Sequence, residues 1–142
     1  MLDTVGHLEG KTFIFPIRVY FEDTDAGGLV YHSNYLKYME RGRTEMSRHL
    51  HVSHSENFNR GQSFFVVRKL EIEYLKPARL DDILEVHTTF TNITKVRLDA
   101  TQDIYRGQVL VASSKVFLAS VDQTGKPARI NETFYKTLKD YI

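Results

Sequence analysis

Residues 13–50 read FIFPIRVYFEDTDAGGLVYHSNYLKYMERGRTEMSRHL, and this stretch decides the fold. In its first part, apolar residues alternate with polar ones, which predicts a half-buried strand. The residues expected on the apolar face are Phe13, Phe15, Ile17, Val19 and Phe21. The dense run of turn residues DTDAGG at positions 23–28 then ends the strand.

The rest of the stretch has the period of a helix with one buried stripe. The stripe consists of Tyr35, Leu36, Tyr38, Met39, Gly42, Met46 and Leu50. Ser33 or Asn34 is the expected N-cap. A glycine in mid-helix costs about 1 kcal/mol relative to alanine. Gly42 therefore indicates that something, most simply a sheet, approaches this face of the helix closely.

Strand-like segments follow this helix over residues 63–76, 83–93, 96–105 and 109–121, and a short amphipathic helix closes the chain over 131–142. The short connections predict antiparallel neighbours. Helices set apart from a run of antiparallel strands indicate the α+β class, with one long helix against about five strands. Long exposed sheet edges are usually paired or covered, so pairing between copies of the chain is expected.

The composition indicates a single domain over residues 1–142, with residues 1–12 as a loose lead-in. The absence of cysteine excludes a thiol nucleophile, a disulfide framework and cysteine-ligated metals, and it favours a cytoplasmic location. We expect no membrane-spanning segment and no secretory signal, because the apolar runs are short. The net charge is +1 and the basic residues are scattered, so the sequence does not predict the basic surface that binding to nucleic acid usually needs.

Residues 22–35 gather three carboxylates, two glycines and a histidine between a strand end and a helix start. A helix N-terminus exposes unpaired N–H groups, so it can hold an oxyanion that develops on a carbonyl. A carboxylate brought back over that end by Gly27 and Gly28 can act as a nucleophile or as a general base on water. A reactive carboxylate and an oxyanion site are the minimum set of groups needed for acyl transfer. The same residues also suit a plain loop, and composition alone leaves both interpretations open.

Other chemistries have weaker support. The loop begins like a calcium loop, but Gly27 and Asn34 occupy the fifth and twelfth positions, where oxygen ligands are needed. His49, His51 and His54 follow the helix, where a cap on the helix dipole is favoured over a metal site. Nucleophile-elbow serines, P-loops and dinucleotide fingerprints are absent. We therefore expect neither a metal nor an organic cofactor.

The string VYFEDTDAGGLVYHSNY at 19–35, followed by ERGRTE at 40–45, resembles the signature of hot-dog-fold acyl-CoA thioesterases of the 4-hydroxybenzoyl-CoA thioesterase family. The later segments 65–69, 73–74 and 77–82 also resemble that family, and the resemblance covers roughly residues 15–121. It points to the YbgC-type branch, which is associated with the bacterial Tol–Pal system. It implies a long central helix wrapped by the sheet, hydrolysis of acyl-CoA to free acid and CoA, and a homo-oligomer. That oligomer is a dimer or a dimer of dimers (a homotetramer) with active sites at subunit interfaces.

The resemblance also implies roles for single residues. The catalytic carboxylate, the second Asp of Asp-x-Asp, falls on Asp25, and the oxyanion contact falls on the backbone N–H at about His32. The His32 imidazole is a candidate for bonding the carbonyl or the water, although a histidine at a helix start equally serves as a cap. Tyr31 and Asn34 are expected to contact substrate, and Asn34 is also placed to support the turn.

Several alternatives stay open. Glu22 and Asp23 are expected to hold the loop or to tune Asp25 through like charge. Glu40 and Glu45 rank behind Asp25 as catalytic carboxylates on the helix. The nearest basic residues for CoA phosphates are Arg68, Lys69, Lys76 and Arg79. The competing function is a scaffold with little turnover, which binds acyl-CoA or acyl carrier protein and serves envelope or phospholipid machinery.

Overall fold

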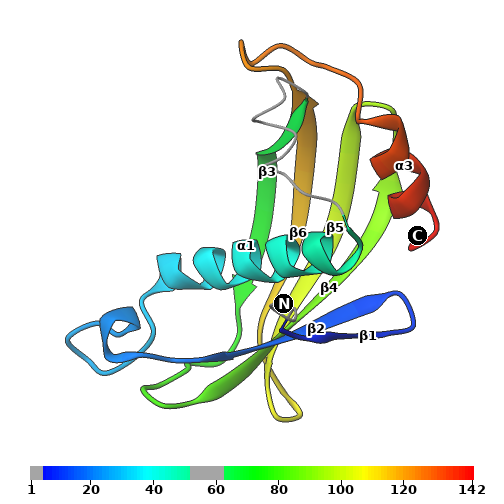
Figure 1. Cartoon of the computed structure of the whole chain (residues 1–142). Helices are drawn as coiled ribbons and strands as arrows, with labels where there is room; N and C mark the ends of the chain where they lie inside the picture. The colour runs from blue at the N-terminus through cyan, green and yellow to red at the C-terminus, as the bar shows by residue number, and fades with distance from the viewer. Residues whose placement is uncertain (1–4, 52–62) are drawn as a thin grey trace.

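The computed structural model describes residues 5–51 and 63–142, and within them one long helix crosses one face of an antiparallel sheet (Figure 1). The helix is α1, His32–His49. The strands are β1 (His7–Glu9), β2 (Thr12–Arg18), β3 (Phe64–Tyr74), β4 (Ile83–Ile93), β5 (Arg97–Arg106) and β6 (Val109–Val121). A short 3-10 helix, η1 (Phe21–Asp23), precedes α1, and helix α3 (Glu132–Lys139) ends the chain.

The expected α+β architecture is confirmed, with two corrections to the sheet. In the described residues it has six strands in the order β1-β2-β4-β5-β6-β3, not five. The additional strand β1 lies in the segment expected to be a loose lead-in, and it pairs with β2 through Leu8 opposite Phe13. In addition, β3 does not neighbour β4. It pairs with β6 at the opposite edge, because residues 75–82 carry the chain across the end of the sheet.

The close packing predicted from Gly42 is confirmed. A Cβ atom at this position would lie 2.9 Å from Cγ1 of Val86 on β4, so a larger residue would push α1 away from the sheet. Beside it, the buried Gln102 amide donates hydrogen bonds to the Met39 carbonyl and to the Thr88 hydroxyl, both at 2.8 Å. The helix is therefore attached to the sheet by a polar network as well as by apolar contact.

Two apolar residues lie where the periodicity did not place them. Leu36, expected in the buried stripe of the helix, is 37% exposed. Phe21, expected on the buried face of the first strand, is 81% exposed in η1. The strand ends at Arg18, and the Tyr20 backbone N–H donates to the Asp23 carboxylate at 2.9 Å, which closes a tight turn and rotates Phe21 outward.

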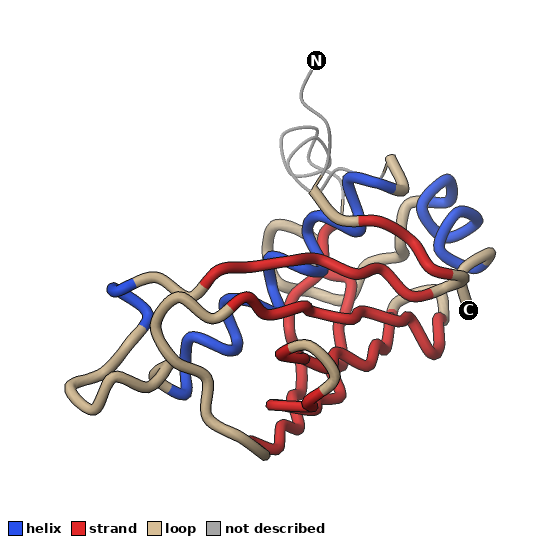
Figure 2. Tube along the Cα trace, turned by 90° about the horizontal axis from the view of Figure 1, so that it is seen from below, coloured by secondary structure: helices blue, strands red, loops and turns tan. Residues whose placement is uncertain are grey.

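The segment with the candidate chemistry projects at one end of the molecule. Figures 1 and 2 show η1 and the following loop beyond the strands, leading into the first turn of α1. Along residues 5–51 and 63–142, no helix has both the length and the apolar character needed to cross a membrane.

Candidate active site

Asp25 lies in the loop between η1 and α1, and its own carboxylate shapes that loop. Its Oδ1 accepts hydrogen bonds from the backbone N–H groups of Gly27 at 2.9 Å and Leu29 at 3.3 Å. Gly28 has a φ of +78°, a left-handed conformation that favours glycine, and this lets the chain reverse tightly. Within the described part of the chain, Oδ2 of Asp25 has no hydrogen-bond partner, so one carboxylate oxygen is held and the other is open.

Asp23 anchors this loop to the start of the helix. Its side chain is buried, and its backbone carbonyl accepts hydrogen bonds from the Tyr31 N–H at 3.0 Å and from the Asn34 amide at 2.8 Å. Burial, with a further contribution from the nearby Asp23 carboxylate, raises the pKa of Tyr38 beneath the loop. Asp23 therefore holds the loop, one of the two roles expected for it, and Asn34 supports the same turn.

The first turn of α1 is not capped by a side chain. The helix begins at His32 with Tyr31 as its N-cap residue, so the prediction of Ser33 or Asn34 as the cap is wrong. Ser33 and Asn34 are the second and third residues of the helix and therefore lie after the N-cap position. The leading N–H groups of a helix carry the positive end of its dipole, and in the described residues the N-cap side chain of α1 accepts none of them.

Asp25, Tyr31 and His32 line one groove of about 380 Å³. Its opposite wall comes from the end of β3 and the residues after it, Tyr74, Leu75, Lys76 and Pro77. The Tyr74 hydroxyl donates a hydrogen bond to the His32 carbonyl at 3.1 Å. The His32 ring lies 4.4 Å from the Tyr31 ring and 6.3 Å, edge-on, from the Tyr74 ring. The imidazole thus lies near two aromatic rings at the start of the helix.

The remaining candidates lie elsewhere. Asn34 is buried behind the groove and does not line it. Glu40 and Glu45 are farther along α1 and line other cavities. Glu45 pairs with Arg48 at 3.0 Å, as expected for a surface ion pair. Among the predicted carboxylates in the described residues, only Asp25 faces the groove at the helix start.

The basic cluster proposed for CoA phosphates is divided by the fold. Lys76 lines the groove with Asp25. Arg68 and Lys69 instead lie over the Phe117 ring on the sheet, at 5.8 and 5.3 Å from its centroid. Tyr74 is a site residue that sequence reasoning did not assign. In the sequence, Tyr74 was indicated by its place in segment 73–74, which agrees with the family resemblance.

The described residues contain no group of three histidine, aspartate or glutamate side chains placed to hold a metal ion. His49 ends α1, in the position expected for a cap on the helix dipole, and its ring lies 5.5 Å from the Phe13 ring. His51 follows at a φ of +61°, and His54 lies outside the described residues.

Comparisons with known proteins show the family and the fold of this chain. The model of a family described as the Thioesterase superfamily matches residues 27–113. The acyl-CoA thioester hydrolase YbgC of Escherichia coli is 46% identical over 111 residues, which cover 78% of this chain and 82% of that protein. The acyl-CoA thioesterase YbgC of Haemophilus influenzae is 41% identical over 110 residues, 78% and 81% of the two chains. The crystal structure of a probable thioesterase from Bartonella henselae superposes with a TM-score of 0.80 at 34% identity, covering 84% of this chain and 99% of that one.

Proposed function

Because this chain belongs to the Thioesterase superfamily and has its hot-dog fold, we propose that it hydrolyses acyl-CoA to free acid and CoA in the groove at the start of α1. Acyl-CoA thioester hydrolysis is the activity named for its relatives in Escherichia coli and Haemophilus influenzae. One observation carries the choice of groove: a carboxylate with one open oxygen and an uncapped helix start share it.

Asp25 is the proposed catalytic carboxylate. The N–H groups of Gly27 and Leu29 hold Oδ1, which fixes the orientation of the side chain and leaves Oδ2 to react. Two routes are open to Oδ2. It adds to the thioester carbon, releases CoA thiolate and forms a mixed anhydride that water then hydrolyses, or it removes a proton from the water that adds to that carbon. In both routes negative charge develops on the carbonyl oxygen.

The start of α1 is the proposed oxyanion site. The backbone N–H at His32 belongs to the uncapped first turn, where hydrogen-bond donors and the helix dipole stabilise negative charge. The His32 imidazole, which lies near the rings of Tyr31 and Tyr74, supplies a second hydrogen bond to the carbonyl or to the water. Tyr31 contacts the substrate with its ring, whereas Asn34 acts through the turn that it supports.

Lys76 is the proposed contact for the CoA phosphates, because it is the basic residue that lines this groove in the described structure. A phosphate contact of this kind strengthens substrate binding without taking part in the reaction. Loss of the contact is therefore expected to raise KM and to leave kcat unchanged.

A homo-oligomer, dimer or dimer of dimers, is also proposed. The edge strand β3 is 11 residues long, and it exposes Val66 and Val67 to solvent. Phe21 is 81% exposed beside the catalytic loop. Long edges and exposed aromatic residues of this kind favour pairing with a second copy. The cytoplasmic location, an acyl carrier protein partner and a link to the Tol–Pal system stay predictions.

Release of CoA thiol from short-chain, long-chain and aromatic acyl-CoAs tests the proposed activity. The chain has no cysteine, so the protein contributes no thiol background. Turnover of one class of acyl-CoA is the expected result, and the preferred class identifies the substrate. Binding of the whole panel without turnover would instead favour the scaffold function.

A further inference from the structure

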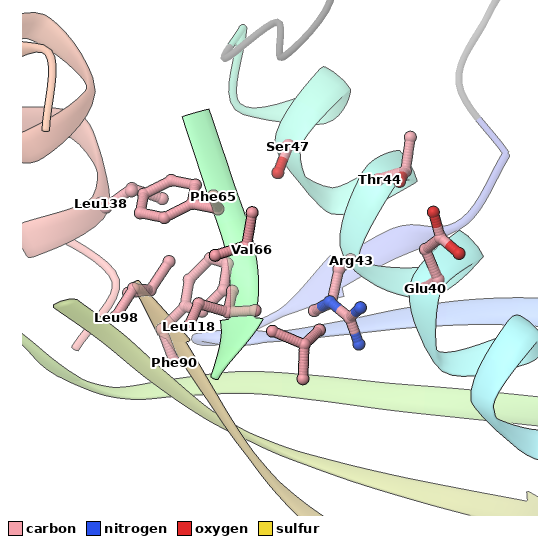
Figure 3. A pocket seen from close by; sticks show the side chains of 11 residues that line it. Glu40, Arg43, Thr44, Ser47, Phe65, Val66, Phe90, Leu98, Leu118 and Leu138 are labelled. Atoms are coloured by element: carbon pink, nitrogen blue, oxygen red, sulfur yellow. The ribbon is translucent and has the colours of Figure 1, made fainter. Parts of the chain in front are cut away.

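The crossover that joins β3 to β4, residues 75–82, supplies part of the far wall of the Asp25 groove. Its residues Leu75, Lys76 and Pro77 line the groove. Among the described residues, those that line the larger cavity in Figure 3 come from α1, the strands and α3, and none comes from the crossover. The crossover belongs to none of the named helices and strands, so contacts with other parts of the chain hold it in place.

Ala78 bonds the crossover to the catalytic loop and to α1. This residue is fully buried, and its carbonyl accepts a hydrogen bond from the Val30 N–H at 2.9 Å. Its own N–H donates to the Tyr35 hydroxyl at 3.2 Å. Beside this contact, Leu29 and Arg79 form an antiparallel bridge. Since Val30 lies two residues before α1 begins, the position of the helix start depends on the position of the crossover.

Arg106, the last residue of β5, joins the two ends of this wall segment. Its Nη1 donates to the Pro77 carbonyl at 2.7 Å and to Oδ2 of Asp82 at 3.4 Å. The same Asp82 oxygen accepts a hydrogen bond from the Arg79 N–H at 2.9 Å. Hydrogen bonds with a charged donor are stronger than neutral ones. We refer to the contact of Arg106 with Pro77 and Asp82 as the Arg106 clamp.

The Arg106 clamp lies behind the groove and not in it. Arg106 does not line the groove, and its side chain is 35% exposed. Its charge nevertheless reaches a residue that does line the groove. Burial raises the pKa of Tyr35, and among the smaller influences the Arg106 charge lowers it and the Asp82 charge raises it. Both charges of the clamp are therefore close to the hydroxyl that bonds Ala78.

We propose that Arg106 is a positioning residue for thioester hydrolysis: by joining Pro77 to Asp82, it fixes the wall that carries Ala78 and so the approach of the catalytic loop to the start of α1. The inference rests on the proposed function, because the geometry that the clamp maintains is that of the oxyanion site. Displacement of a reacting group by about 1 Å can cost about a hundredfold in rate. Loss of the clamp is therefore expected to be measurable in kcat.

The kinetics of acyl-CoA hydrolysis test this role. Arg106→Gln is expected to lower kcat by about tenfold and to change KM by less than about twofold, because the side chain does not line the groove. Arg106→Lys keeps a charged donor for the same two oxygens and is expected to restore most of kcat. Arg97→Gln is the matched control, since Arg97 is exposed at the opposite end of β5, and it is expected to change neither constant.

Hydrogen exchange of the Val30 and Ala78 amides, measured without substrate, tests the clamp separately from the activity. Both amides are hydrogen-bonded, so their exchange reports how often the wall opens. Faster exchange at both is expected in Arg106→Gln, with exchange in the centre of β4 unchanged. Unchanged exchange at both amides would overturn the proposal, and so would an equal loss of kcat in Arg97→Gln. Absence of turnover in the wild type would overturn the proposed function, and faster exchange in Arg106→Gln would then still show the clamp.

Asp82→Asn provides a second route to the same contact, and thermal unfolding checks that both variants are folded. The asparagine keeps an oxygen for the Arg79 N–H but removes the charge opposite Arg106. A fall in kcat of about threefold is expected, together with faster exchange at Ala78. Wild-type kcat and exchange in Asp82→Asn would contradict the clamp.

Discussion

The Tyr74 hydroxyl at the end of β3 donates a hydrogen bond to the backbone carbonyl of His32, the first residue of α1, at 3.1 Å. This bond connects one edge of the sheet to the beginning of the helix, and the two sides of the candidate groove meet at it. The position of the His32 N–H relative to the far wall therefore depends on a contact outside the catalytic loop.

Replacement of Tyr74 by phenylalanine is expected to loosen this junction. Loss of one hydrogen bond lowers the free energy of unfolding by about 0.5–1.5 kcal/mol, and kcat is expected to fall severalfold because the helix start is less firmly held. Thiol-release kinetics and urea unfolding measure the two effects. Tyr20→Phe is the control, since Tyr20 is 59% exposed and does not line the groove. Equal losses in both variants would contradict a specific role for Tyr74.

Substitution of Gly42 by alanine tests how closely the helix lies on the sheet. Helix propensity favours alanine by about 1 kcal/mol. The added methyl group would meet Val86 at 2.9 Å, and overpacking typically costs about 1–3 kcal/mol. We expect a net loss of stability, measured as a lower Tm. Lys37→Ala, at an exposed position of the same helix, is expected to change little. A higher Tm for Gly42→Ala would show that the helix moves freely away from β4.

Alkaline pH is expected to destabilise the protein through three tyrosines that lose hydration on folding. Burial raises the pKa of Tyr35, Tyr38 and Tyr74 above the ordinary value of 10.0. Above pH 10 the unfolded chain loses these protons before the folded chain does, so the free energy of unfolding falls as the pH rises. The stabilisation is complete below pH 10, where both states are protonated.

Tyr38→Phe isolates one contribution to this pH dependence. The Tyr38 hydroxyl is buried and has no hydrogen-bond partner among the described residues, so its removal is expected to be neutral or to stabilise by up to about 1 kcal/mol at pH 8. Urea unfolding at several pH values between 8 and 11 should give a shallower decline for the variant than for the wild type. Parallel declines would exclude Tyr38 as a source.

Lys76→Ala is expected to separate binding from chemistry. If Lys76 contacts the CoA phosphates, KM for acyl-CoA rises severalfold while kcat is unchanged. KM for a short thioester that lacks the nucleotide is expected to stay the same. Lys69→Ala is the matched control, because Lys69 lies over Phe117 and outside the groove. An equal change in KM for both thioesters would exclude the phosphate contact.

Much of the fold was readable from the sequence because it depends on local periodicity. The bounds expected for β4 and β6 agree with the structure, and the close approach at Gly42 followed from helix propensity alone. The pairing of β3 with β6 was not readable, because short connections favour chain neighbours and this partner is set by the whole sheet. The exposure of Phe21 was not predicted either. Phe21 continues the alternation that includes Val19, but the hydrogen bond from the Tyr20 N–H to the Asp23 carboxylate closes a turn there, and Phe21 is exposed.

The sequence predicted the part of the candidate site whose residues lie close together in the chain. Asp25, Tyr31 and His32 come from one loop and the helix start that follows it, and the structure brings them into one groove. Tyr74 ends β3 and Lys76 follows it, more than forty residues later in the chain, and no local pattern there indicates contact with the helix start. The inward turn of the Asn34 amide toward Asp23 likewise depends on packing that a linear motif does not specify.

The most direct test of the account is the kcat of Asp25→Asn with the best acyl-CoA, measured beside Glu22→Gln. The amide of the variant keeps an oxygen for the N–H groups of Gly27 and Leu29, so the loop is expected to stay folded, with Tm and oligomer size unchanged. Glu22 is an exposed acid three residues away that does not line the groove. The account predicts a fall in kcat of about a hundredfold or more for Asp25→Asn and near wild-type activity for Glu22→Gln. Wild-type activity in Asp25→Asn would contradict it and would move the chemistry to Glu40 or Glu45.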